Sequence, residues 1–244
     1  MNCDSNHRLT LPGIGNSFID IIKEHYKHLI KNEGKKLIVF DFNNSFNDFV
    51  NDFDVEVIDF SKDNVFLNIF DISPYYDVVS YLYPSKVEKF NRAIIKKSNQ
   101  IIDIYKLIQD NTLSEEYTII DKCIVEIYKN IKNPIMDDFY FCLEKMGTPS
   151  SKVILNAFKS TFKGPFNAFT DRTSIDINKD IIIFKLDIDI ASIELLMNFI
   201  LFDLVWNIIS ERKHKGIDTF VYYGKPNIVM PYKELSSFAK HICL

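Results

Sequence analysis

The sequence predicts an α/β protein with a mainly parallel sheet that is interrupted by an all-α insertion. Short apolar runs typical of buried strands alternate with helical periodicity near the start of the chain, and they do so again near its end. A long middle stretch shows helical periodicity alone. Because strands that alternate with helices form parallel sheets with right-handed crossovers, both outer parts are expected to contribute strands to one sheet.

The first part, residues 1–73, contains a predicted helix over residues 17–32 and then two strands. Apolar residues recur on one face of this helix, and Gly34 follows its end, as glycine does at many helix C-termini. The run KKLIVFDF reaches Asp41, and the run VEVID follows after a polar gap. Both runs predict buried strands, and NVFLNIFDIS behind them predicts an extended segment.

The middle part, residues 74–150, is predicted to be the all-α insertion. The stretches FNRAIIKKSNQIIDIYKLI and SEEYTIIDKCIVEIYKNI carry apolar residues at helical spacing. Ser114 is expected to be the N-cap of the second helix, because Glu115 and Glu116 would then fill its first turn. The stretch NPIMDDFYFCLEKM predicts one more helix, with Pro134 near its first turn.

The last part, residues 151–244, returns to strands and helices. DIIIFKLDI predicts a central strand, DTFVYYG a further strand and PYKELSSFAKHICL a closing helix. Residues 191–212 predict one long helix, whose apolar stretch is interrupted about once per turn by four polar residues: Glu194, Asn198, Asp203 and Asn207. Since a bilayer span needs about 20 largely uninterrupted apolar residues, we expect a buried helix with a narrow polar stripe, and no membrane span.

The amino-acid composition argues against several classes of function. The chain has 244 residues, 47% of them hydrophobic, and a net charge of −4, which fits a globular protein with a real core and offers no case for nucleic-acid binding. Its four cysteines form no CxxC pair. Neither a disulfide framework nor a metal site is therefore predicted, and a reducing cytoplasm is the expected location.

The opening stretch LTLPGIGNSFIDIIKEHY is compared with the phosphate-binding loop pattern G-x-x-x-x-G-K-[ST]. The predicted loop and helix start comprise Gly13, Ile14, Gly15, Asn16, Ser17 and Phe18. Gly15 and Ser17 match the pattern, whereas Asn16 stands where the lysine should be. Two interpretations stay open on this stretch alone: a nucleotide site that lost its cation, or a tight turn before a helix.

The whole chain, over residues 7–243, resembles the C-terminal motor domain of TraC/TraE-type ATPases of the VirB family, which serve bacterial conjugation and type IV secretion. The resemblance rests on segments that occur in the family's order: LIVFDFNNSF, NIFDIS, EEYTIIDKCIVEIYKN, MDDFYFCLEKM, FKGPFNAFTDRTSIDI and DIIIFKLDI. It implies a RecA-like P-loop NTPase core, ATP and magnesium as ligands, and Asp41 as a further position of the nucleotide site.

The resemblance also implies that catalytic groups are missing. Asn16 stands at the lysine position, and Gly224 and Lys225 stand where a strand should end in Asp-Glu. Such carboxylates hold the magnesium-bound water and polarise the attacking water. The family continues into further strands beyond the point where this sequence stops. We therefore expect a degenerate, C-terminally truncated member, with no cofactor assigned and ATP with magnesium as the alternative.

Three hypotheses for function follow. The first is a non-hydrolysing scaffold or regulator that works with conjugation or secretion proteins, in the cytoplasm or at the inner face of the cell membrane, as a monomer or a homo-oligomer. The second is a weak or partner-completed ATPase, with Lys225 reaching the phosphates. The third is a decayed remnant from a bacterial mobile element.

Overall fold

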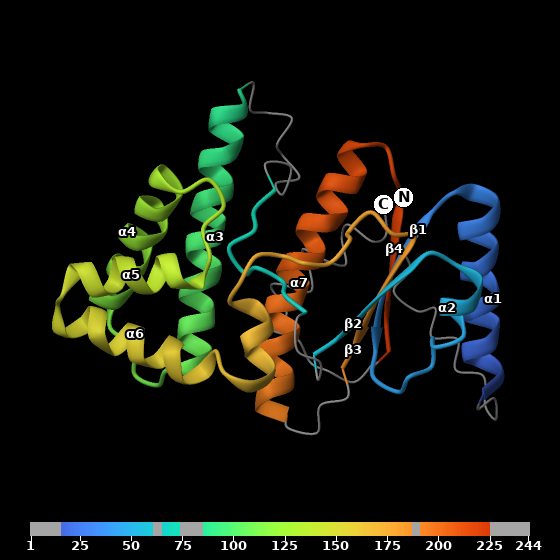
Figure 1. Ribbon diagram of the computed structural model, residues 1–244, viewed down its shortest axis with the longest axis horizontal. Helices are drawn as coiled ribbons and strands as arrows, with labels where there is room; N and C mark the ends of the chain where they lie inside the picture. Colours follow the sequence, from blue (N-terminus) through green and yellow to red (C-terminus); the bar gives the residue numbers. More distant parts are fainter. Residues whose placement is uncertain (1–15, 61–64, 74–84, 187–190, 225–244) are drawn as a thin grey trace, which may run out of the picture.

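The computed structural model describes residues 16–60, 65–73, 85–186 and 191–224 (Figure 1). In chain order the elements are α1 (Asn16–Glu33), β1 (Lys36–Asp41), α2 (Phe49–Asp52), β2 (Val55–Asp59), α3 (Lys86–Ile108), α4 (Ser114–Asn130), α5 (Met136–Met146), α6 (Pro149–Thr161), the 3-10 helix η2 (Gly164–Phe169), β3 (Ile181–Lys185), α7 (Ala191–His214) and β4 (Thr219–Tyr223).

The four strands form one parallel sheet in the order β2-β3-β1-β4. β3 lies between β2 and β1, although the helices α3 to α6 separate it from them in sequence. The strands before and after the helical stretch therefore form a single sheet, and the predicted α/β class with a helical interruption is confirmed. β1 and β3 are buried on both faces, which explains their continuous apolar runs.

Helices cover both faces of the sheet, and a helical block lies beyond one of them (Figure 1). Here the helical block means α3, α4, α5 and α6. One core cluster lies between the sheet and α1 and includes Leu37 and Val39 of β1. The other includes Ile38 and Phe40 of β1, extends through α7 and continues into the helical block. Alternate residues of β1 thus serve the two cores, as the strand pleat requires.

The helix α1 matches the prediction, and Gly34 ends it with a φ of +63°, a conformation that favours glycine. Three lysines one helical turn apart lie over three phenylalanine rings of the segment that follows β1: Lys23 over Phe46, Lys27 over Phe49 and Lys31 over Phe53. These cation–π contacts fix α1 against that segment on one face of the sheet.

The helical block differs from the prediction in two details. The predicted N-cap at Ser114 is wrong by one residue, because Leu113 holds the cap position and Ser114 is the first helical residue. The Leu113 N–H donates to the Glu116 carboxylate at 2.7 Å, so the glutamate stabilises this helix start. The helix α6, which was not predicted, begins after Thr148, whose hydroxyl accepts the Ser151 N–H at 3.1 Å. The boundaries of the insertion at residues 74–150 stay a prediction.

The predicted buried helix is confirmed as α7, and two residues of its polar stripe connect it to other segments. Asp203 pairs with Lys97 of α3, and Asn207 bonds the chain at Asp71 and Ser73. Among the described residues, no helix combines the length and apolar character needed to cross a membrane. The predicted closing helix lies outside the described residues.

Candidate functional site

The carboxyl ends of the strands form the candidate site, because parallel α/β sheets bind ligands at this edge. We call it the carboxyl edge: the ends of β1 and β4 with the residue after each, Asp41, Phe42, Tyr223 and Gly224, and the end of β3 at Lys185. The helices α1 and α7 both begin at this edge, as Figure 1 shows. Their N-termini bring partial positive charge to it.

The structure places only part of the predicted nucleotide site. Asn16, Ser17 and Phe18 are the first residues of α1, so the helix begins where the phosphate-loop alignment requires. Gly13, Ile14, Gly15 and Lys225 lie outside the described residues. Asp41 ends β1 and Gly224 follows β4 directly, and the two strands are neighbours in the sheet.

The Asp41 carboxylate holds the turn that follows β1. It is buried, with 4% of the residue exposed. Its Oδ1 accepts the N–H groups of Asn43 at 3.3 Å and Ser45 at 3.0 Å, and its Oδ2 accepts the N–H of Phe46 at 3.0 Å. Within this turn Asn44 has a φ of +54°. Asp41 is thus a positioning residue for this loop, and both of its oxygens are already engaged.

Gly224 sits where the chain leaves almost no room for a side chain. Its N–H donates to the Phe40 carbonyl at 3.0 Å. A Cβ on Gly224 would lie 3.0 Å from that same carbonyl oxygen and 3.4 Å from the Phe42 ring. Any side chain at this position would need β1 or the Phe42 ring to shift slightly, so close approach to β1 favours glycine here.

Aromatic rings fill the space beside Gly224. On the α7 side of the sheet, ring centroids are 5.0 Å apart for Phe40 and Phe202, 5.2 Å for Phe42 and Tyr223, and 5.6 Å for Phe202 and Tyr223. Among the described residues the Tyr223 hydroxyl has no hydrogen-bond partner. Burial, and to a lesser extent the charge of Glu194, raises the pKa of that hydroxyl. Aromatic rings thus make up much of the described part of this face, and the Glu194 carboxylate is the acidic group that acts on Tyr223.

One cation lies on the other face of the edge. Lys185 of β3 is in register with Asp41 of β1 and with Asp59 of β2, so the three side chains share the face covered by α1. Sequence reasoning missed Lys185 as a site residue, although it lies within the predicted strand DIIIFKLDI. Within the part of the chain that the structure describes, no group of three His, Cys, Asp or Glu side chains is placed to hold a metal ion.

No protein-family model matches the sequence, and no curated protein matches it significantly. Among solved structures, the chain is similar to VirB4 of Thermoanaerobacter pseudethanolicus, with a TM-score of 0.69 over 93% of this chain and 88% of that one. The fold is VirB4-like. At 13% identity this similarity concerns the fold alone, and the expected α/β class with a parallel sheet is confirmed.

Proposed function

We propose that this chain is a VirB4-like component of a bacterial conjugation or type IV secretion machine, and that it does not hydrolyse ATP. It serves as a scaffold or regulator that binds other proteins of the machine, at the cytoplasmic side of the membrane and in homo-oligomers. The VirB4-like fold and the ordered resemblance to TraC/TraE-type ATPases support the machine. The carboxyl edge supports the absence of hydrolysis.

The close packing of Gly224 is the observation that carries the proposal. A hydrolysing member of the family needs a carboxylate at this point for the magnesium-bound water. In this chain even the Cβ of such a side chain would lie 3.0 Å from the Phe40 carbonyl oxygen and 3.4 Å from the Phe42 ring. The packing around this position therefore favours glycine over an acidic residue.

The residue at the lysine position of the phosphate loop also argues against hydrolysis. Asn16 at the start of α1 offers no cation for the β- and γ-phosphates. Loss of one preorganised charge-stabilising donor lowers a catalytic rate by about 10²–10³. Restoring the lysine alone would still leave the β4 end without its carboxylate, so the two losses are expected to act together.

A phosphate-release assay on the full chain with magnesium and ATP tests the absence of hydrolysis. We expect background rates for the wild type, for Ser17→Ala and for Asn16→Lys. Wild-type turnover above background that Ser17→Ala abolishes would overturn the proposal. In the host, deletion of the chain should lower conjugation or secretion, and Ser17→Ala should restore it as fully as the wild type.

A second function, ATP binding without efficient turnover or with a partner's help, is favoured by Lys185. This residue brings a cation to the face of the edge that α1 covers. Equilibrium binding of magnesium-ATP to the wild type and to Lys185→Ala distinguishes the two functions. Binding that Lys185→Ala weakens tenfold or more supports this second function, whereas the scaffold proposal expects no specific binding by either protein.

A further inference from the structure

Three sulfur-bearing side chains meet where α4 packs against α5. Cys123 comes from α4, and Cys142 and Met146 come from α5. The Cys123 Sγ lies 3.8 Å from the Met146 Sδ. Cys142 and Met146 are one helical turn apart, so they share a face of α5, and the Cys142 thiol also interacts with that of Cys123.

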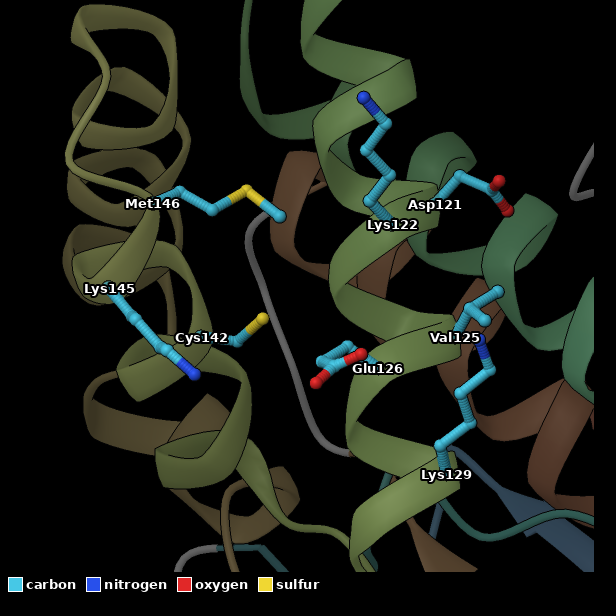
Figure 2. Close-up of a pocket in the computed structure, with 8 residues that line it drawn as sticks. All are labelled: Asp121, Lys122, Val125, Glu126, Lys129, Cys142, Lys145 and Met146. Atoms are coloured by element: carbon cyan, nitrogen blue, oxygen red, sulfur yellow. The ribbon is translucent and has the colours of Figure 1, made fainter.

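Two of these three side chains, Cys142 and Met146, line an open pocket, so a small ion has a route to them. The pocket has a volume of about 490 Å³ and is lined by Asp121, Lys122, Val125, Glu126, Lys129, Cys142, Lys145 and Met146. In Figure 2 the sulfur atoms of Cys142 and Met146 point into the space between α4 and α5. Cys123 is fully buried beside them and shows no exposed surface.

The spacing of the sulfur atoms suits a shared metal ion. With metal–sulfur bonds of about 2.3 Å, two sulfur ligands are separated by about 3.8 Å in a tetrahedral site and by about 4.0 Å in a trigonal one. The observed 3.8 Å between the Cys123 and Met146 sulfur atoms falls at this separation. An ion could thus bridge the two helices with little movement of either.

We propose that Cys123, Cys142 and Met146 bind a soft monovalent metal ion of the Cu(I) class between α4 and α5. Thiolate and thioether ligands select soft ions, and Cu(I) accepts three sulfur ligands. Zinc prefers four ligands, drawn from thiolates, imidazoles and carboxylates, and no such group occurs among the described residues. The choice of ion therefore follows from the methionine.

Binding releases two protons and leaves the oxidation state of the metal unchanged. Each of the two thiols loses its proton to solvent as its metal–sulfur bond forms, and the neutral thioether of Met146 completes the site. Two thiolates and one Cu(I) carry a net charge of −1. The same pocket is lined by Lys122, Lys129 and Lys145 and by Asp121 and Glu126, so three positive and two negative side chains leave a net charge of +1 to offset it.

Titration of the reduced full chain with Cu(I), under anaerobic conditions and against a chromogenic Cu(I) chelator, tests the site. We expect one equivalent to bind, with affinity at least 100-fold weaker in Cys142→Ser and at least tenfold weaker in Met146→Leu. The double variant Cys3→Ser/Cys243→Ser is the matched control, because it removes the other two cysteines of the sequence and should bind like the wild type.

X-ray absorption of the copper-loaded wild type is a second test, which does not depend on whether the variants fold. The spectrum should show three sulfur neighbours of copper at about 2.3 Å. Unchanged affinity in Cys142→Ser would overturn the proposal, as would a copper site with nitrogen or oxygen as its main ligands. A chain that binds no Cu(I) and instead forms a Cys123–Cys142 disulfide with a mild oxidant would also overturn it.

Discussion

The carboxyl edge and the junction between the helical block and the core differ in what their buried polar groups connect. At the edge, Asp41 accepts bonds from the turn that directly follows it, whereas the bonds at the junction join segments far apart in the sequence. By junction we mean residues 65–73 together with the parts of α3 and α7 that they contact. At the carboxyl edge, rings pack beside Gly224, and the Tyr223 hydroxyl has no partner among the described residues. At the junction, buried polar groups from segments far apart in the sequence bond one another.

Lys97 is the centre of the junction. Its ammonium group, on a side chain only 2% exposed, donates to the Ile69 carbonyl at 2.6 Å, to Gln100 Oε1 at 2.7 Å and to Asp203 Oδ2 at 2.7 Å. Nearby, Asn68 donates to the Pro134 carbonyl at 2.8 Å. A buried charge with this many partners ties α3, α7 and residues 65–73 into one arrangement.

The difference between the two regions fits a scaffold better than a motor. A nucleotide-driven enzyme needs its most demanding polar geometry at the carboxyl edge, where charge develops during the reaction. In this chain buried bonds of Lys97 and Asn68 join the helical block to the core.

Removing the buried cation should cost the most. Lys97→Met leaves the Asp203 carboxylate, which is 10% exposed, without its partner. Loss of one member of a buried pair lowers the free energy of unfolding by about 3–5 kcal/mol, and urea denaturation measures it. The double variant Lys97→Met/Asp203→Leu should recover much of that loss. A single-variant loss below about 1 kcal/mol, the level of an exposed pair, would contradict the central place given to Lys97.

Two asparagines of α7 offer a matched test of bonded against unbonded amides. The Asn207 amide accepts the Ser73 N–H at 3.3 Å and donates to the Asp71 carbonyl at 3.0 Å. Asn198 is fully buried, and its amide has no partner among the described residues. Asn207→Leu should therefore lower the free energy of unfolding by about 2 kcal/mol, and Asn198→Leu should leave it unchanged or raise it. Equal losses would show that the bonds of Asn207 add nothing.

The sequence predicts the two packed faces well and the junction poorly. β1, β3 and α7 are found because burial imposes a period on apolar residues, and the polar stripe of α7 is visible for the same reason. Lys97 lies in the lysine-rich stretch KKSNQ of α3 and resembles any solvated lysine. Only the packing of α3 against α7 buries it, and no local pattern encodes that long-range contact.

The candidate site shows the same limit. Asn16 is identified by alignment with the phosphate-loop pattern, and Gly224 by its position directly after the strand that should end in Asp-Glu. Both identifications depend only on the residue type at a fixed position of a motif. Gly224 is hard to replace because two residues from elsewhere in the chain lie close to it. These are Phe40 of β1, through its carbonyl oxygen, and Phe42 directly after β1, through its ring. The register between β1 and β4 creates that contact, so it could not be predicted from either segment alone.

Side chains placed at Gly224 test whether the carboxyl edge is packed shut. Both Gly224→Ala and Gly224→Asp put a Cβ about 3.0 Å from the Phe40 carbonyl oxygen. Overpacking of this kind should lower the free energy of unfolding by about 1–2 kcal/mol in each variant, measured by urea denaturation, and Gly224→Asp should gain no ATPase activity. If Gly224→Asp were as stable as the wild type while Gly224→Ala was not, the edge would hold a vacant acidic position.

The smallest predicted effect concerns Asp71 of the junction, which accepts bonds from Asn68 and Thr173. Burial raises the pKa of this carboxyl above its usual value, and the two hydrogen bonds and the charge of Lys97 offset only part of that rise. The folded chain therefore holds the proton more tightly than the unfolded chain does. The stability from this group is fully present below the unfolded pKa of about 4 and is lost as pH rises through the folded value.

Urea denaturation of the wild type and of Asp71→Asn between about pH 3 and pH 7 measures this effect. The stability of the wild type relative to Asp71→Asn should fall as pH rises and then level off. Asp176 is the control with the opposite sign, because a hydrogen bond from the Asn178 backbone N–H lowers the pKa of that exposed carboxyl. Relative to Asp176→Asn, wild-type stability should therefore rise with pH. If the Asp71 difference also rose with pH, the charge of Lys97 and the bonds from Asn68 and Thr173 would outweigh burial, and the junction would favour an ionised Asp71.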